Sequence, residues 1–214
     1  MFYNKSELSN TVNVTTSNYG TSDANPTPES EAYISAANIT DVSHQNAVRQ
    51  LFFQFMNQGY LYGKLQAFYP FLGTTAAQHK WNAKNPLDTN AAFRLQFFGG
   101  GTHSNLGYQC NGTNAYANTF LIPSANTSVE NSGITLVSGT NNPAPNNNTL
   151  DFGSEETTSY PGFNLSLRRR NGTVASDELV GFIGTFINAS QNGTVRITDS
   201  DIRGATTFVS TSLS

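Results

Sequence analysis

Turn-forming residues divide the chain into short pieces from Gly73 onward, and this spacing limits the fold more than any other feature. Glycine, asparagine and proline separate β-favouring runs there, which is typical of an antiparallel β-sandwich or jelly roll. The Asn171-Gly172 and Asn192-Gly193 pairs favour tight hairpins, so the last strands should pair as antiparallel neighbours. We expect strands at residues 92–98, 119–122, 134–137, 163–169, 179–188 and 194–198, with a seventh candidate at 205–213.

Residues 28–69 form the only part of the chain in which we predict helices. Thr27 can cap a first helix that starts at Pro28, since a proline loses nothing at that position, and Asn38 should close it. A second helix should begin near Asp41, end at Gly59, and be followed by one short turn of helix before residue 70. Its apolar side chains recur at helical spacing and predict one buried face: Val48, Leu51, Phe52, Phe55 and Met56.

The N-terminal residues are polar and carry the breakers Gly20, Pro26 and Pro28, so they cannot pack by themselves. We therefore divide the chain into an extended anchoring arm at 1–27, a helical lead at 28–72 and a β-sandwich at 73–214. The fold class expected is mainly β, with the helices and the arm as appendages.

The composition excludes several classes of protein. Only 12% of residues are charged, whereas Asn, Ser and Thr fill 72 of 214 positions and aromatic residues 12%. Such a chain is not a disordered charged tail, and its net charge of −3 offers no basic surface for nucleic acid. The single cysteine, Cys110, excludes an internal disulfide and a cysteine-based zinc site. No apolar run is long enough for a membrane span, and we expect no secretory signal in MFYNKSELSN.

One block carries a family resemblance. It reads YPFLGTTAAQHKWNAKNPLDTNAAFRLQFFGGGTHSNLG from Tyr69 and continues as NGTNAYANT, after an AANIT segment that starts at Ala36. This block resembles the concanavalin A-like (laminin-G-like) sandwich domain of bacteriophage virion proteins, most densely over residues 30–120. The resemblance implies an antiparallel sandwich on a phage fibre or particle and attaches no chemistry to the block. Domains of that kind usually carry further strands beyond Ser214, so we expect a fragment or a sheet completed by another chain.

Acidic residues do not occur in the pattern that glycan hydrolysis needs. Two carboxylates on one strand face would be required, and outside the predicted helices the only alternating pair is Asp199 and Asp201, in what reads as a turn. We therefore predict no catalytic residue, no enzyme activity and no cofactor. Asp199 and Asp201 are also the only calcium candidates, beside the simpler interpretation as solvated turn acids. The three histidines lack metal-site spacing, and His79 is expected to orient a loop.

Glycan binding has candidates in the aromatic and basic residues near the loops. Exposed rings can stack on the apolar face of a sugar, and arginines that alternate on a strand share one face. Core packing for the tyrosines and a solvated strand end for the arginines remain the alternatives. The candidates are Tyr108, Tyr116, Tyr160, Arg168 and Arg170.

These observations predict a bacteriophage virion protein, namely a fibre, spike or decoration protein of the head or tail, that attaches to host-surface glycans. Its arm would bind other virion proteins, and the chain would form a homo-oligomer such as a trimer on the particle surface. The alternative is a purely structural oligomerisation or anchoring module that binds no glycan.

Overall fold

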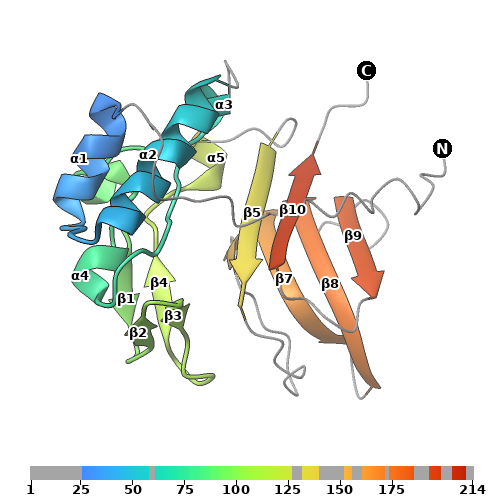
Figure 1. Ribbon diagram of the computed structural model, residues 1–214. Coiled ribbons are helices and arrows are strands. Elements are labelled where there is room, and N and C mark those ends of the chain that lie inside the picture. The colour runs from blue at the N-terminus through green and yellow to red at the C-terminus, as the bar shows by residue number, and fades with distance from the viewer. Residues whose placement is uncertain are drawn as a thin grey trace. The chain divides into compact units, whose positions relative to one another are not determined.

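The chain divides into two compact units, Met1–Phe120 and Leu121–Ser214 (Figure 1). The computed structural model describes residues 26–57, 61–126, 132–139, 152–155, 161–171, 174–185, 193–198 and 204–210. The predicted arm at 1–27 lies outside them except for its last two residues. The sequence placed a boundary at residue 73, whereas the first unit continues to Phe120.

Helix α1 (Pro28–Ala36) begins as the sequence predicts. Thr27 and Ser30 form a capping box, in which the Thr27 hydroxyl accepts from the Ser30 amide at 3.1 Å. Asn38 ends the helix with a left-handed φ of 49°. Helix α2 (Val42–Asn57) starts after Asp41, whose carboxylate accepts from the His44 amide at 2.8 Å. The short helix α3 (Leu61–Lys64) follows, so the helices predicted within residues 28–69 are confirmed. That these residues are the only helical part is wrong, because short helices also form at Ala76–His79 and Pro123–Asn126.

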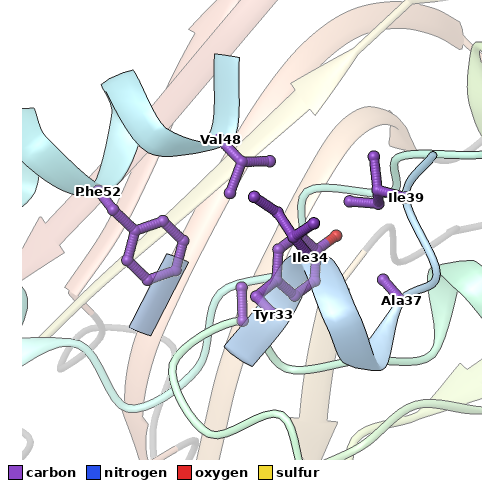
Figure 2. Close-up of a cluster of buried hydrophobic side chains, with 7 residues drawn as sticks. Tyr33, Ile34, Ala37, Ile39, Val48 and Phe52 are labelled. Atoms are coloured by element: carbon purple, nitrogen blue, oxygen red, sulfur yellow. The ribbon is translucent and has the colours of Figure 1, made fainter. Parts of the chain in front are cut away.

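The core of the first unit lies between α1 and α2 (Figure 2). Tyr33 and Phe52 are each 1% exposed, and Val48 is 2% exposed, as the helical spacing requires. Met56, Tyr62, Phe68, Leu72 and Trp81 pack around this cluster. Removing a buried aromatic ring of this kind costs about 3–5 kcal/mol, so the helices form a true core and not an appendage.

Residues 66–95 run over this core mostly as loops, held by one buried amide. Asn82 is 1% exposed, and its oxygen accepts from the Phe68 amide at 3.0 Å. Its nitrogen donates to the Ala92 carbonyl at 3.0 Å. Two backbone hydrogen bonds join the same segments: the Ala83 amide donates to the Phe68 carbonyl, and the Leu95 amide donates to the Lys80 carbonyl. The block from Tyr69 therefore belongs to the helical unit.

Regular structure in the rest of this unit is brief. Thr75 caps the short helix α4 (Ala76–His79), and a 3₁₀ turn, η2 (Asn90–Ala92), precedes the first strand. Strand β1 (Gln96–Phe98) pairs with β4 (Tyr116–Asn118), and β2 (Thr102–Ser104) pairs with β3 (Gly107–Gln109), both antiparallel. Each is a sheet of two strands.

The last strands of the second unit pair as antiparallel neighbours, as predicted, but the tight hairpin predicted at Asn192-Gly193 is wrong, because Gly193 lies in a strand opposite Ile183. After a short helix α5 (Pro123–Asn126), β5 (Ser132–Ser138) pairs with β10 (Gly204–Ser210). The strands β6 (Phe152–Glu155), β7 (Pro161–Asn171), β8 (Val174–Thr185) and β9 (Gly193–Thr198) form an antiparallel sheet in chain order. Asn171 pairs with Val174 across the expected Asn-Gly connection, which confirms the hairpin there.

The prediction of a mainly β, concanavalin A-like sandwich or jelly roll is wrong. Among the described residues, 73–120 supply only two sheets of three-residue strands, and the core of their unit is helical. Two residues interrupt the expected strands: Phe93 and Phe120 have left-handed φ values of 58° and 56°. A strand at 92–98 is therefore shortened to Gln96–Phe98, and 119–122 forms no strand before Pro123 starts a helix.

Candidate binding face

Four exposed side chains gather on one face of the β1–β4 pair. In this antiparallel ladder Gln96 lies opposite Asn118, and Phe98 lies opposite Tyr116. Because side chains alternate between the faces of a strand, these four share one face, and all four are exposed. We call Gln96, Phe98, Tyr116 and Asn118 the binding face.

Two aromatic rings form the centre of the binding face. The Phe98 and Tyr116 rings stack with centroids 4.9 Å apart and planes 18° from parallel. They nevertheless remain 37% and 55% exposed. The two rings cover each other on their inner faces, so the pair is a pre-formed platform whose outer ring face and ring edges stay in water, and the apolar side of a pyranose can stack on such a face.

Amide groups border the rings. Gln96 and Asn118 form the next pair on the same face of the ladder, and amides both donate and accept hydrogen bonds. The Asn118 oxygen already accepts from the Phe120 amide at 2.8 Å, which fixes its side chain. The face therefore combines an apolar centre with polar groups suited to hydroxyls.

A rigid loop supports the face from the side. The Asn111 oxygen accepts from the amides of Thr113, Asn114 and Ala115, each at 3.0 Å, and its nitrogen donates to the Gly99 carbonyl at 2.6 Å. Gly99 has a φ of 76°, and a Cβ there would overlap the Asn114 backbone. The loop is therefore locked against the turn that follows Phe98.

The opposite face of β1 is closed by rings. Phe97 packs on His103 with centroids 4.5 Å apart and on Tyr108 with centroids 4.8 Å apart. The Tyr108 hydroxyl is buried, and burial raises the pKa of this phenol, with the neighbouring Cys110 adding to the effect. Tyr108, one of the predicted sugar contacts, thus belongs to the support of β1, on the side away from Tyr116.

The other predicted glycan and calcium contacts lie in the second unit. Arg168 and Arg170 lie in β7, where the pairing with β8 shifts register between Ser166 and Arg169 and again before Asn171. Tyr160 and the calcium candidates Asp199 and Asp201 lie outside the described residues. Of the predicted set, only Tyr116 belongs to the binding face; Gln96, Phe98 and Asn118 are additions from the strand register.

Two histidines that the sequence treated separately meet in the fold. His79 and His103 lie 24 residues apart, yet their Nδ1 atoms are 3.0 Å apart. In the part of the chain that the structure describes, no three His, Cys, Asp or Glu side chains gather as metal ligands. Burial lowers the pKa of His79, and burial together with the charge of His79 lowers that of His103.

An open groove of about 420 Å³ lies beside Trp81, between the end of α1 and the start of α4. Lys80 Nζ sits 4.6 Å from the Trp81 ring centroid, and the ring also packs on the helical core. Because these contacts leave the indole only partly exposed, the groove offers less free ring surface than the binding face does.

Comparisons of the chain with models of protein families, with curated proteins and with solved structures find no match. None of the helices in the described ranges combines the length and the apolar character needed to cross a bilayer.

Proposed function

We propose that the chain is a structural component of a bacteriophage particle that attaches to host-surface polysaccharide through the binding face. The observation that carries the proposal is the stacked, half-exposed Phe98–Tyr116 pair with an amide pair beside it. The block from Tyr69 that resembles phage virion domains supports the location on a particle, as a fibre, spike or decoration protein. The charge-poor surface rich in Asn, Ser and Thr supports it as well.

A sugar would stack on the outer face of one ring of the pair, with its hydroxyls bonded to Gln96 and Asn118. Contacts of this kind at one open face give affinities of about 1 mM, or about −4 kcal/mol. We propose that several copies act together as a homo-oligomer, such as a trimer, on one particle. Simultaneous contacts raise the effective affinity by roughly 10²- to 10⁴-fold when the spacing allows them.

The face binds and does not cleave. No Asp or Glu occurs between Gln96 and Asn118 in the sequence, so the face has no carboxyl group to protonate a leaving oxygen and none to activate water. We propose no enzyme activity and no cofactor. A soluble preparation should release no reducing sugar from any polysaccharide that it binds.

The polar N-terminal residues would anchor the chain to other virion proteins. Deleting residues 1–25 leaves Thr27 and its capping box in place, so α1 can still form. The truncated protein should keep its thermal transition and its polysaccharide binding but fail to enter particles. Incorporation of the truncated chain at the normal level would refute the anchoring role.

The test of attachment compares three proteins on host cells and on their purified surface polysaccharide. Tyr116→Ala removes one ring of the platform and should weaken binding at least tenfold, which corresponds to 1.4 kcal/mol. Leu106→Ala is the matched control, since this leucine is 92% exposed in the same unit but lies in the β2–β3 turn. It should bind as the unmodified protein does.

The other function to be distinguished is an oligomerisation or anchoring module without glycan binding. If the unmodified protein binds no host polysaccharide even as an assembled oligomer, attachment is wrong and the structural role stands. A monodisperse monomer in light scattering would count against the multivalent mechanism.

A further inference from the structure

The contact between His79 and His103 has a restricted protonation state. Their Nδ1 atoms face each other at 3.0 Å, which is a hydrogen-bond distance. One ring must therefore donate through Nδ1–H while the other accepts at an unprotonated Nδ1. If both imidazoles are protonated to the cationic form, both Nδ1 atoms carry a hydrogen, the two N–H groups point at each other, and the contact cannot persist.

The surroundings of the two imidazoles do little to stabilise positive charge on them. His79 is 1% exposed, and the rings of Phe71, Phe97 and Tyr108 pack around the two imidazoles. Within the described residues no carboxylate pairs with either ring; the one ion pair of a histidine joins His44 to Asp41.

The other polar and titratable groups nearby are few. The Gly73 carbonyl favours the protonated His79 ring, but burial outweighs it. Tyr108 faces His103, with Cys110 beside its hydroxyl. Lys80 follows His79 in the chain, and its ammonium group pairs with Asp88. Among the residues that the structure describes, further positive charge at the pair would therefore have no counter-charge.

The pair joins two elements that have few other connections. His79 ends α4, and His103 is the central residue of β2, whose partner β3 is only three residues long. A hairpin with so short a ladder is marginal by itself and depends on contacts with its surroundings. Its contacts with the rest of the unit include His103 on His79 and the His103 and Tyr108 rings on Phe97.

We propose that the His79–His103 pair is an acid-sensitive latch, which holds the β2–β3 hairpin at neutral pH and releases it when both rings are protonated. The direction follows from burial: both rings take up protons less readily in the folded chain, so the latch is complete above about pH 6.5 and weakens below it. Phe97 rests on the hairpin and is adjacent to Phe98, so release would also remove the support of the binding face. Only this last consequence rests on the proposed function.

Nuclear magnetic resonance of the full chain between pH 5 and 8 tests the latch. At pH 7.5 one of the two rings should be the Nδ1–H tautomer and the other the Nε2–H tautomer. Both should titrate below pH 6.5. Over the same range the β2–β3 amides that bond across the ladder should lose hydrogen-exchange protection tenfold or more, after correction for the intrinsic pH dependence of exchange.

Two variants isolate the pair. His103→Phe keeps a ring beside Phe97 but cannot titrate, so its protection should change less than twofold between pH 7.5 and 5.5. His44→Gln removes the exposed histidine of α2 and should behave as the unmodified chain.

Three results would overturn the proposal. The hairpin amides could stay protected while both rings titrate, the rings could titrate independently at or above pH 6.5, or a chelator could change the histidine spectrum, which would mean a bridging metal ion. If His103→Phe does not fold, the titration of the unmodified chain decides alone. Polysaccharide binding plays no part in these measurements, so failure of the attachment proposal leaves them interpretable.

Discussion

Asn82 is the residue whose loss should do the most damage to the first unit outside its helical core. Its side chain makes four hydrogen bonds: it accepts from the amides of Phe68 and Lys84 and donates to the carbonyls of Gln66 and Ala92. In Asn82→Ala these backbone groups lose their partner. The Ala92 carbonyl carries most of the effect, since its bond is fully buried, and the Phe68 amide, whose bond is partly buried, adds to it.

The magnitude follows from the cost of an unsatisfied buried group, about 1–3 kcal/mol each. Two such groups give a loss of about 3 kcal/mol in the free energy of unfolding. With a urea dependence of roughly 2 kcal/mol per molar for a unit of this size, the urea midpoint should fall by about 1.5 M.

Fluorescence of Trp81 provides the assay, because it is the only tryptophan and lies in the first unit. Asn85→Ala is the control, since this exposed asparagine three residues away should change stability by less than about 0.5 kcal/mol. A midpoint shift below 0.5 M for Asn82→Ala would refute the view that this amide holds the loops on the core.

Two further predictions concern charge and the loop beside the binding face. Arg49 donates to Glu31 at 2.6 and 3.0 Å and lowers the pKa of this carboxyl. Glu31→Gln should therefore destabilise the chain by well under 1 kcal/mol at pH 7, given the exposure of the pair. The difference should shrink as the pH falls below the ordinary pKa of a glutamate and vanish below the lowered pKa of Glu31, which thermal unfolding at several pH values can check. Gly99→Ala should leave the chain folded by circular dichroism but weaken polysaccharide binding at least fivefold, because its Cβ would overlap the Asn114 backbone. Gly100→Ala is the control, because Gly100 has almost the same left-handed φ but open space around it. Gly100→Ala should therefore bind more strongly than Gly99→Ala. Equal binding by the two glycine variants would show that the steric overlap is irrelevant.

The sequence predicted those parts of the fold that depend on neighbouring residues. Thr27 before Pro28 marks the start of α1, and the Asn171-Gly172 pair marks the β7–β8 connection, because capping and hairpin turns are local preferences. The sandwich prediction failed where local preference misleads. Phenylalanine favours strands, yet Phe93 and Phe120 adopt left-handed φ values that few residues of this type take.

The binding face and the histidine pair were less predictable than the fold, because they depend on contacts between residues that are distant in the sequence. Tyr116 could be chosen from its place beside an Asn-rich loop, but Phe98 and Gln96 join it only through the register of β1 with β4. Phe98 lay inside a run that reads as a sandwich strand, so its exposure was hidden. The contact between His79 and His103 could not be predicted at all. Sequence motifs for histidine sites place the two residues a few positions apart, whereas these two lie 24 residues apart and meet only in the fold.

The most direct test of attachment is to observe the rings themselves. Aromatic carbon–proton spectra of the chain should be recorded with and without host-surface polysaccharide, with the Phe98 and Tyr116 signals assigned through Phe98→Leu and Tyr116→Leu. Binding at the face predicts that the signals of both rings shift on addition of polysaccharide, while those of Trp81, which is partly buried against the helical core and is not part of the binding face, stay in place. Shifts at Trp81 with none at Phe98 and Tyr116 would contradict the account.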